Sequence, residues 1–210
     1  MSLSDLSGDV LRVILNNLDT RQAVRCSILS SRWRHVPGLL SNIDLDVNSF
    51  TPADDGFTST LSDAARNNLE MVQAVQSLLA HESRHDIHRL KLRFFSRDES
   101  VGIIRAVDDA MARGRRILDL RFYVLSEKPF AGCPGRYMAR LGKRFLYCFD
   151  TYPRVFAGLT GLRLEEFSDV VIACKNLIYL ALVNCDFREE TALMIQHEKL
   201  RGMNLDFLHL

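Results

Sequence analysis

The stretch LIYLALVNC, residues Leu177–Cys185, carries the strongest indication of the fold of this chain. It fills the frame L-x-x-L-x-L-x-x-N/C, with leucine at the first three fixed positions and Cys185 at the last. In this frame alternate leucines point inward from one strand of a parallel stack, and the Asn or Cys side chain satisfies backbone groups where the chain turns. Because each such strand exposes its inner face until a neighbour covers it, the stretch predicts a stacked array.

The same frame recurs along the chain, in whole or in part, at residues 90–92, 118–120, 159–167 and 200–208. The intervals are uneven, since Leu120 to Leu164 spans 44 residues but Leu164 to Leu182 only 18. We therefore expect a degenerate repeat within residues 137–155 and a shortened connection at residues 165–172. The last strand, at residues 200–208, is expected to present a bare edge.

Two amphipathic helices are predicted between these strands, over residues 61–81 and 100–113. The second points Ile104, Val107 and Met111 inward, and Arg113 followed by Gly114 gives it a cation and a permissive residue at its end. Residues 43–47 alternate apolar and acidic side chains, as a half-buried strand does, and the polar residues 48–60 predict a linker or surface loop. The inward stripe of the first helix is predicted to be Leu61, Ala65, Leu69, Val72, Val75, Leu78 and Leu79.

The amino-terminal residues 6–36 carry a different pattern. Apolar side chains recur there at helical spacing, and Trp33, the only tryptophan of the chain, follows among basic residues. Three helices of this length are too small to close a core of their own. Some apolar surface is left over, and we interpret it as a docking face for a partner protein. An apolar stripe on its own is more often core, and Trp33 can equally be the largest core residue of this unit.

This region resembles an F-box. The family pattern Leu-Pro-x-Asp-Val/Ile-Leu corresponds to residues 6–11, Ile-Leu-x-x-Leu to residues 14–18, and the Ser-Lys/Arg-Arg-Trp turn to residues 30–33. The family proline is Ser7 here, and the lysine before Arg-Trp is Ser31. The resemblance implies docking on a Skp-type linker of a cullin-based ubiquitin ligase. The implied contact residues are Leu6, Ser7, Val10, Leu11, Ile14, Leu18, Ile28, Leu29 and Trp33.

The later region resembles the leucine-rich repeats of the plant F-box/leucine-rich-repeat family, as a short or truncated member. We expect an α/β fold in which a small three-helix F-box at residues 4–40 and a strand and linker at 41–60 precede an irregular array of parallel strands and helices at 61–210. A target protein is expected on the strand face that flanks the inward leucines. The positions that we expect to contact it are Lys91, Arg93, Asp119, Arg121, Arg163, Glu165, Ala181 and Val183.

Composition narrows the function classes. The 27 basic and 26 acidic residues leave a formal charge of +1, which argues against nucleic acid or an anionic membrane as the partner. The five cysteines are odd in number and none lie at C-x-x-C spacing, so we expect reduced thiols, with Cys174 and Cys185 packed as repeat core and Cys133 in a turn. The longest strongly apolar run is far shorter than a membrane span. A protein of the cytoplasm, the nucleus or both is expected.

One catalytic pattern competes with this interpretation. Residues His81, Glu82 and His85 satisfy H-E-x-x-H, in which two histidines grip zinc and the glutamate polarises a bound water. The position three residues past His85 is His88, where the extended motif has glycine, and Glu99 is the nearest candidate for a third ligand. The pattern also lies at the predicted end of a helix, where a solvated histidine is favoured by the helix dipole.

Three functions follow, in order of preference. The first is a substrate-recognition adaptor of a cullin-RING ubiquitin ligase, which binds a linker and a target, has no catalytic residues and needs no cofactor or metal. The second is a non-catalytic repeat scaffold with a degenerate F-box, to which the serine at position 7 points. The third is a zinc hydrolase acting through His81, Glu82 and His85.

Overall fold

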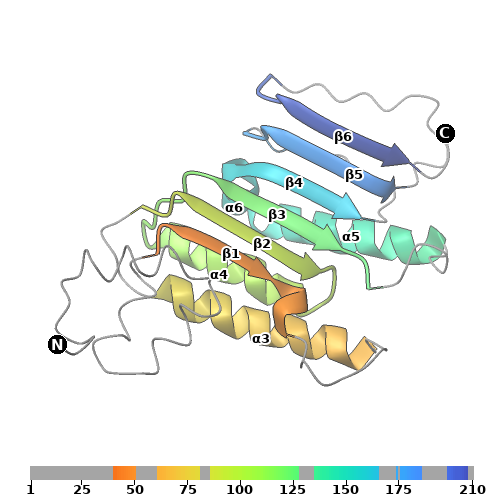
Figure 1. Ribbon diagram of the computed structural model, residues 1–210, viewed down its shortest axis with the longest axis horizontal. Coiled ribbons are helices and arrows are strands. Elements are labelled where there is room, and N and C mark those ends of the chain that lie inside the picture. The colour runs from red at the N-terminus through yellow and green to blue at the C-terminus, as the bar shows by residue number, and fades with distance from the viewer. Residues whose placement is uncertain are drawn as a thin grey trace.

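The computed structural model describes residues 40–50, 61–80, 86–127, 135–165, 174, 176–185 and 198–207. Within them, six parallel strands form one sheet in chain order, as Figure 1 shows. The strands are β1 (Asn42–Asp46), β2 (Arg89–Phe95), β3 (Leu120–Leu125), β4 (Leu159–Glu165), β5 (Tyr179–Cys185) and β6 (Gly202–Phe207). The helices are η3 (Val47–Phe50, a 3₁₀ turn), α3 (Leu61–Ala80), α4 (Ser100–Ala112), α5 (Gly135–Thr151) and α6 (Pro153–Gly158).

The four α-helices lie on one side of the sheet (Figure 1). Strand side chains alternate between the two faces, so every second residue of β2 and β3 turns toward the helices and is buried. The intervening residues face away and stay partly accessible. The predicted α/β class, with parallel strands and helices, is confirmed. The described helices cover one face of the sheet, and none of them covers the other, which is called here the open face.

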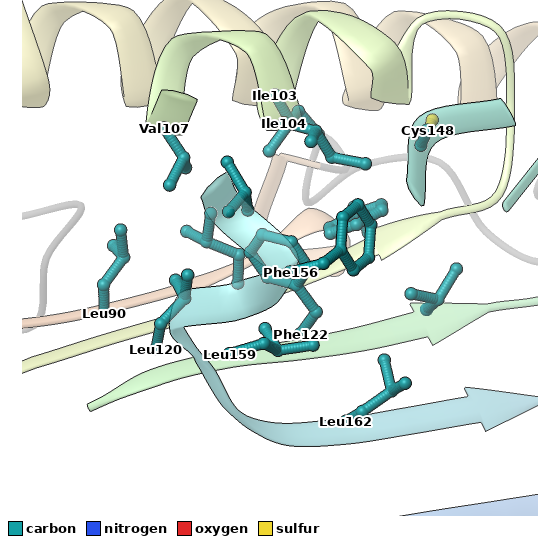
Figure 2. Packing of buried hydrophobic residues seen from close by; sticks show 14 of the residues in the cluster. Leu90, Ile103, Ile104, Val107, Leu120, Phe122, Cys148, Phe156, Leu159 and Leu162 are labelled. Carbon is teal, nitrogen blue, oxygen red and sulfur yellow. The ribbon is translucent and has the colours of Figure 1, made fainter. Parts of the chain in front are cut away.

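The core lies between the sheet and the helices, and Figure 2 shows its centre. Edge-to-face aromatic contacts link Phe94 of β2, Phe122 of β3, Phe156 of α6 and Phe145 of α5, with ring centroids 5.6, 6.3 and 5.4 Å apart in that order. Aromatic pairs favour this geometry because the positive edge of one ring meets the negative face of the other. The contacts fasten α5 and α6 to the middle of the sheet.

The predicted inward stripe of α3 is partly wrong. Leu69 is 51% exposed, whereas Ala64, Asn68 and Met71 are buried, so the inner face is rotated from the one expected. The physical reason is Asn68, whose amide nitrogen donates to Phe95 O at 2.9 Å and whose Oδ1 accepts from Phe95 N at 3.2 Å. β1 ends at Asp46, opposite the residue two before Phe95, so the asparagine takes the place of a missing strand partner.

The prediction for α4 is confirmed in its main features. Ile104 and Val107 are buried and Met111 packs against the core. The helix ends at Ala112, and Gly114 then takes a φ of +87°, a conformation in which a β-carbon is strained. The Arg113–Gly114 stop therefore lies where the sequence placed it.

Two repeat predictions need correction. In β3 the inward residues are Leu120, Phe122 and Val124, while Leu118 is 51% exposed, because the strand starts later than its leucines suggested. The long interval contains no degenerate repeat at residues 137–155: α5 and α6 occupy it, and β3 pairs directly with β4. Pro153 stands in the first turn of α6, where its missing N–H has no helical partner to lose.

The ends of the sheet also differ from expectation. The strand predicted in residues 41–60 is β1, which pairs with β2 and so belongs to the same sheet as the later repeats. At the other end, Met203 and Leu205 of β6 are 52% and 38% exposed, although the frame made them inward positions. Within the described residues β6 pairs only with β5. The domain boundaries at residues 40 and 60 stay a prediction, and the F-box residues lie outside the described part.

The buried cysteines support the repeat frame. Cys185 donates its thiol to Leu164 O at 3.7 Å and lies 3.6 Å from Val183 O, as expected of the turning position. Cys174 is also buried in the core, as predicted. Burial raises the pKa of Cys174 to about 12 and that of Cys148, on α5, to about 11, so both are held as neutral thiols. Cys133 lies outside the described residues.

Candidate binding face of the repeat sheet

Six charged residues of the open face lie in two rows of register partners that cross the strands. One row runs from Asp44 through Lys91, Arg121, Gly161 and Tyr179 to Gly202. The next runs from Asp46 through Arg93, Tyr123, Arg163 and Ala181 to Asn204. The parallel pairing places these residues side by side from β1 to β6, because neighbouring strands lie only about 4.8 Å apart.

Asp119, just before β3, is a hydrogen-bonding node on this face. Its Oδ1 accepts from Arg121 Nε at 2.9 Å and from the Thr160 hydroxyl at 2.7 Å, and its Oδ2 accepts from Arg89 Nε at 3.0 Å. Partial burial disfavours the charged carboxylate, but these three hydrogen bonds outweigh it and hold the pKa of Asp119 below its ordinary value. The node joins three successive strand regions through one ionised group.

Tyr123 stands at the centre of the open face. Lys91 Nζ lies 5.2 Å and the Arg93 guanidinium carbon 5.4 Å from its ring centroid, both within cation–π range. Arg163 is its register partner on β4. Tyr123 therefore has cations on both neighbouring strands.

Each cation around Tyr123 also has a carboxylate partner. Lys91 Nζ binds Asp44 at 2.8 Å, Arg93 Nη1 binds Asp46 at 2.7 Å, and Arg163 binds Glu165 at 2.9 Å. Hydrogen bonding to Asp119 raises the pKa of Arg121 above its ordinary value, despite partial burial. Paired in this way, the cations are held in fixed positions on the face.

Small residues make room for large ones across the strands. A β-carbon on Gly161 would lie 2.9 Å from Arg121 Cγ, so the aliphatic part of that arginine lies over β4. At Gly202 an added β-carbon would lie 3.1 Å from the ring of Tyr179. The two glycines allow their larger neighbours to lie against the next strand.

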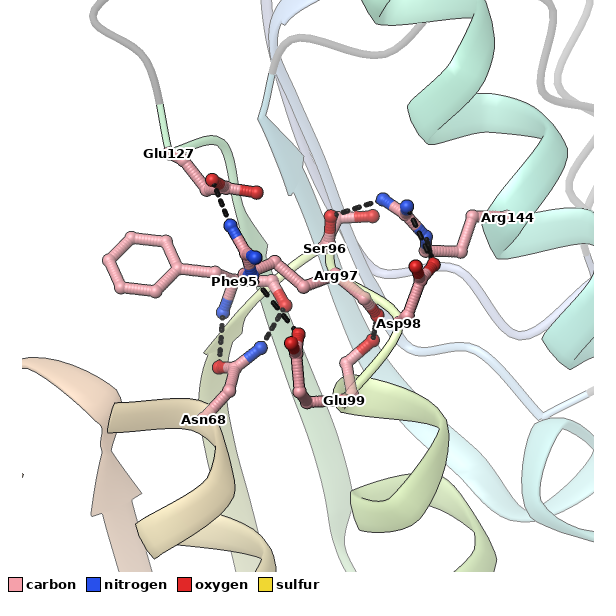
Figure 3. A network of polar contacts seen from close by, with 9 residues as sticks. Asn68, Phe95, Ser96, Arg97, Asp98, Glu99, Glu127 and Arg144 are labelled. Carbon is pink, nitrogen blue, oxygen red and sulfur yellow. Dashed lines mark hydrogen bonds and ion pairs between the residues drawn. The ribbon is translucent and has the colours of Figure 1, made fainter. Parts of the chain in front are cut away.

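A polar network fixes the carboxyl end of β2 and β3, as Figure 3 shows. Arg97 binds Glu99 at 3.0 Å and also binds Glu127, whose side chain is only 8% exposed. Burial lowers the pKa of Arg97, but the two glutamates outweigh it and the pKa is raised overall. From α5, Arg144 donates to Ser96 O at 2.7 Å and to Asp98 at 2.9 Å. The loop after β2 is therefore tied to a helix that comes later in the chain.

The structure brings the predicted target-contact residues together. Lys91, Arg121, Arg93 and Arg163 occupy adjacent register positions, with Asp119 before and Glu165 after them. Ala181 and Val183 continue the face on β5, although Ala181 is buried. Four further residues of this face, Tyr123, Asp44, Asp46 and Thr160, are not among the contact residues predicted from the sequence. Strand alternation could have predicted the first three, because Tyr123 lies two residues from Arg121 on the same strand, and Asp44 and Asp46 alternate with apolar residues. Thr160 was not predictable in this way, because it reaches Asp119 only through the register shift between β3 and β4.

Other predicted sites lie outside the described residues. All nine linker-contact positions, from Leu6 to Trp33, are among them, and so are His81, Glu82 and His85. Among the residues that the structure describes, no three His, Cys, Asp or Glu side chains are grouped to hold a metal. None of the helices described is long and apolar enough to cross a bilayer.

Comparison with known proteins gives the amino-terminal part a family. Residues 3–38 match the model of the F-box domain. The chain is similar to plant F-box and F-box/LRR-repeat proteins, and the match to the F-box domain lies at its amino-terminal end. A putative F-box protein of Arabidopsis thaliana is 25% identical over 90% of this chain and 43% of its own length. An F-box/LRR-repeat protein of the same plant is 28% identical over 60% of this chain and 31% of its own length.

An FBD-associated F-box protein of Arabidopsis thaliana is 48% identical, over 23% of this chain and 12% of its own length. The chain spans less than half of the length of each of these three relatives. No solved structure matches it. The sequence resemblance to F-box proteins with leucine-rich repeats is confirmed by these matches and by the parallel sheet.

Proposed function

We propose that this chain is a substrate-recognition adaptor of a cullin-RING ubiquitin ligase. Its F-box docks on a Skp-type linker, and the open face of its repeat sheet holds a target protein. The observation that supports this most is the F-box match at residues 3–38, joined in one chain to a parallel repeat sheet. The proposal assigns no bond chemistry to the chain itself.

The adaptor acts by proximity. Holding a target beside a ubiquitin-charged enzyme turns an encounter between two diffusing proteins into one within a single complex, and so raises the effective concentration of the target's lysines. A rigid support serves this role, because a binding face that keeps its shape loses less entropy on binding. The aromatic contacts from β2 to α5 and the Asp119 node supply that rigidity.

The first test addresses the linker. Replacing Ile14 and Leu18 by Asp in the full chain places charge in the proposed apolar docking stripe. We expect pull-down of a purified Skp-type linker to be lost, since burying two unpaired carboxylates costs several kcal/mol, on the order of the whole docking energy.

The matched control is Leu69→Asp with Ile178→Asp. Both side chains are large, apolar and exposed, at 51% and 45%, so this double variant adds the same charge outside the F-box. It should bind the linker as the unaltered chain does. Undiminished linker binding by the Ile14 and Leu18 variant, with an unchanged circular dichroism spectrum, would reject the adaptor assignment.

The alternative is a repeat scaffold whose F-box no longer docks, and the serine at position 7 favours it. Co-expression with the linker separates the two. An adaptor forms a one-to-one complex that survives gel filtration, whereas a scaffold elutes apart from the linker. Restoring the family residue by Ser7→Pro should strengthen an existing complex or create one that was lost.

We also propose the cytoplasm, the nucleus or both as its location. This rests on five cysteines without C-x-x-C spacing, of which Cys148, Cys174 and Cys185 are buried thiols. Imaging of the fluorescently tagged full chain tests it, and accumulation in the secretory pathway would contradict it.

A further inference from the structure

We infer that the open face recognises an acidic segment of the target protein, and that it does so at six register positions on β2, β3 and β4. This inference rests on the proposed adaptor function and names the chemistry of its target. The six positions, called here the cationic block, are Lys91, Arg93, Arg121, Tyr123, Gly161 and Arg163.

The cationic block concentrates positive charge between carboxylates that flank it on three sides, and its fourth side faces Tyr179 and Ala181 of β5. Four of its six residues are cations, and none is acidic. Asp44 and Asp46 lie on β1 at one side, while Asp119 precedes the block and Glu165 follows it. The charges of the whole face nearly balance, but those of the block do not. A partner that covers the block alone meets a net positive surface.

The carboxylates position the cations without exhausting their donors. Arg93 uses only Nη1 toward Asp46, and Arg163 uses Nε and Nη2 toward one oxygen of Glu165. A guanidinium has five N–H donors, so each of these side chains keeps donors that make no hydrogen bond within the described residues. The side chains of Lys91, Arg93, Arg121 and Arg163 are 25%, 36%, 36% and 33% exposed, which leaves them open to an incoming anion.

This arrangement is pre-organised for carboxylates. Long cationic side chains normally lose conformational entropy when they bind an anion. Here the peripheral carboxylates and the Tyr123 ring already restrict Lys91 and Arg93. Charge-assisted hydrogen bonds to a partner's carboxylate are about twice as strong as neutral ones. The face therefore favours an acidic peptide over a neutral one.

The outer surface of α5 carries two cations that no ion pair among the described residues holds in place, in contrast to those of the cationic block. Arg136 and Lys143 are exposed there and form no ion pair within the described residues. Among the described residues, no carboxylate pairs with them as Asp44, Asp46 and Glu165 pair with cations of the block. Nucleic acid is a poorer partner for the block than a peptide, because the surrounding carboxylates repel a long phosphate backbone. The α5 pair provides a control of equal charge.

The probe for this inference is a phage-displayed library of random dodecapeptides, selected on the full chain immobilised by a carboxyl-terminal tag. We expect Asp and Glu to be enriched among the selected peptides. The best peptide is then resynthesised with each acidic residue changed to the amide, and separately to phosphoserine. Fluorescence anisotropy of these peptides distinguishes a carboxylate from a phosphate as the recognised anion.

The test variant is Arg93→Gln with Arg163→Gln, and the control is Arg136→Gln with Lys143→Gln. Both remove two positive charges. We expect the test variant to weaken peptide binding by about tenfold or more, which corresponds to one charge-assisted hydrogen bond, and the control to stay within about twofold. If the test variant fails to keep the thermal midpoint of the parent, Lys91→Gln alone replaces it.

Selection of peptides without acidic enrichment would overturn the inference, as would equal losses in test and control variants. The Ile14→Asp and Leu18→Asp double variant separates linker docking by the F-box from peptide binding by the open face. If it selects the same acidic peptides, the binding face stands independently of linker docking. If the unaltered chain selects acidic peptides but binds no linker, this inference is supported and the adaptor role is refuted.

Discussion

The asparagine at position 68 offers a quantitative test of how the sheet is completed. Its buried amide forms two hydrogen bonds with the backbone of Phe95, at 2.9 and 3.2 Å, beyond the end of β1. Asn68→Ala removes both and leaves a backbone N–H and C=O without that partner. At about 1 kcal/mol for each bond, plus part of the desolvation cost of the exposed groups, we expect a loss of about 2–4 kcal/mol in the free energy of unfolding.

The variant Asn68→Asp tests the hydrogen-bonding role of this position separately from its size. The carboxylate of Asn68→Asp still accepts from Phe95 N but cannot donate to Phe95 O, and its burial raises the pKa of the new carboxyl. When that carboxyl is protonated it donates again. The variant should therefore be less stable than Asn68→Ala near pH 7 and should gain stability relative to it as pH falls through the raised pKa.

Urea unfolding of the full chain, followed by circular dichroism, measures both effects. Gln73→Ala is the control, because Gln73 is exposed on the same helix and its loss should change the free energy by less than about 0.5 kcal/mol. Equal stability of Asn68→Ala and Gln73→Ala would refute the view that the asparagine replaces a strand partner. A pH-independent difference between the Asp and Ala variants would refute the hydrogen-bonding account.

Two further predictions concern the core and the Asp119 node. Phe156→Ala should lower the free energy of unfolding in urea by about 3–5 kcal/mol, because removing a ring that is 1% exposed and contacts Phe122 and Phe145 leaves a cavity. The control Tyr147→Ala should change it little, because Tyr147 on α5 is 58% exposed. Comparable losses in the two variants would contradict that packing. The lowered pKa of Asp119 means that its stabilisation is complete above its ordinary pKa of 3.8 and is lost as pH falls through the lower folded value. The stability difference between the parent and Asp119→Asn should therefore be largest near neutral pH and shrink below pH 3.8, and a constant difference in a pH series of urea titrations would contradict it.

The repeat frame predicted the parallel sheet because it reports on burial directly. Leu180 and Leu182 are fully or almost fully buried, and Cys185 bonds to the backbone as the frame requires. The frame failed where a leucine lies just outside the strand, as Leu118 does. A leucine count does not distinguish a residue at the entrance of a strand from one inside it. The aromatic residues Phe94 and Phe122, which fill the core of β2 and β3, were missed because the frame was scored on leucine.

The phase of α3 could not be predicted from hydrophobic periodicity alone. Asn68 occupies an inward position for a reason that lies in another element, the early end of β1. The arrangement of α5 and α6 is a similar case. The unusually long interval from Leu120 to Leu164 predicts a degenerate repeat, whereas it holds helices whose aromatic residues reach the sheet. The inward face of α3 and the helices α5 and α6 therefore depend on tertiary contacts that local sequence patterns do not report.

The binding face was largely predictable, since alternation along a strand assigns each residue to one side. What the sequence did not supply was the pairing, because the contacts from Lys91 to Asp44 and from Arg93 to Asp46 each join residues 47 positions apart. Those ion pairs change which anions the charged residues can be expected to bind. Four unpaired cations would suggest a general anion-binding surface, whereas cations held in place by neighbouring carboxylates define a smaller and more selective one.

Stability alone does not account for so many ion pairs on one face. Exposed salt bridges contribute about 0–1 kcal/mol each, and those of the open face are all partly exposed. A parallel sheet usually has both faces covered, so the face that no described helix covers must stay solvated. Charged pairs meet that need and also keep the side chains in register with one another. A solvated face with ordered side chains is suited to a partner protein that covers it as a second layer would. The net positive charge of the cationic block indicates that the covering segment is acidic.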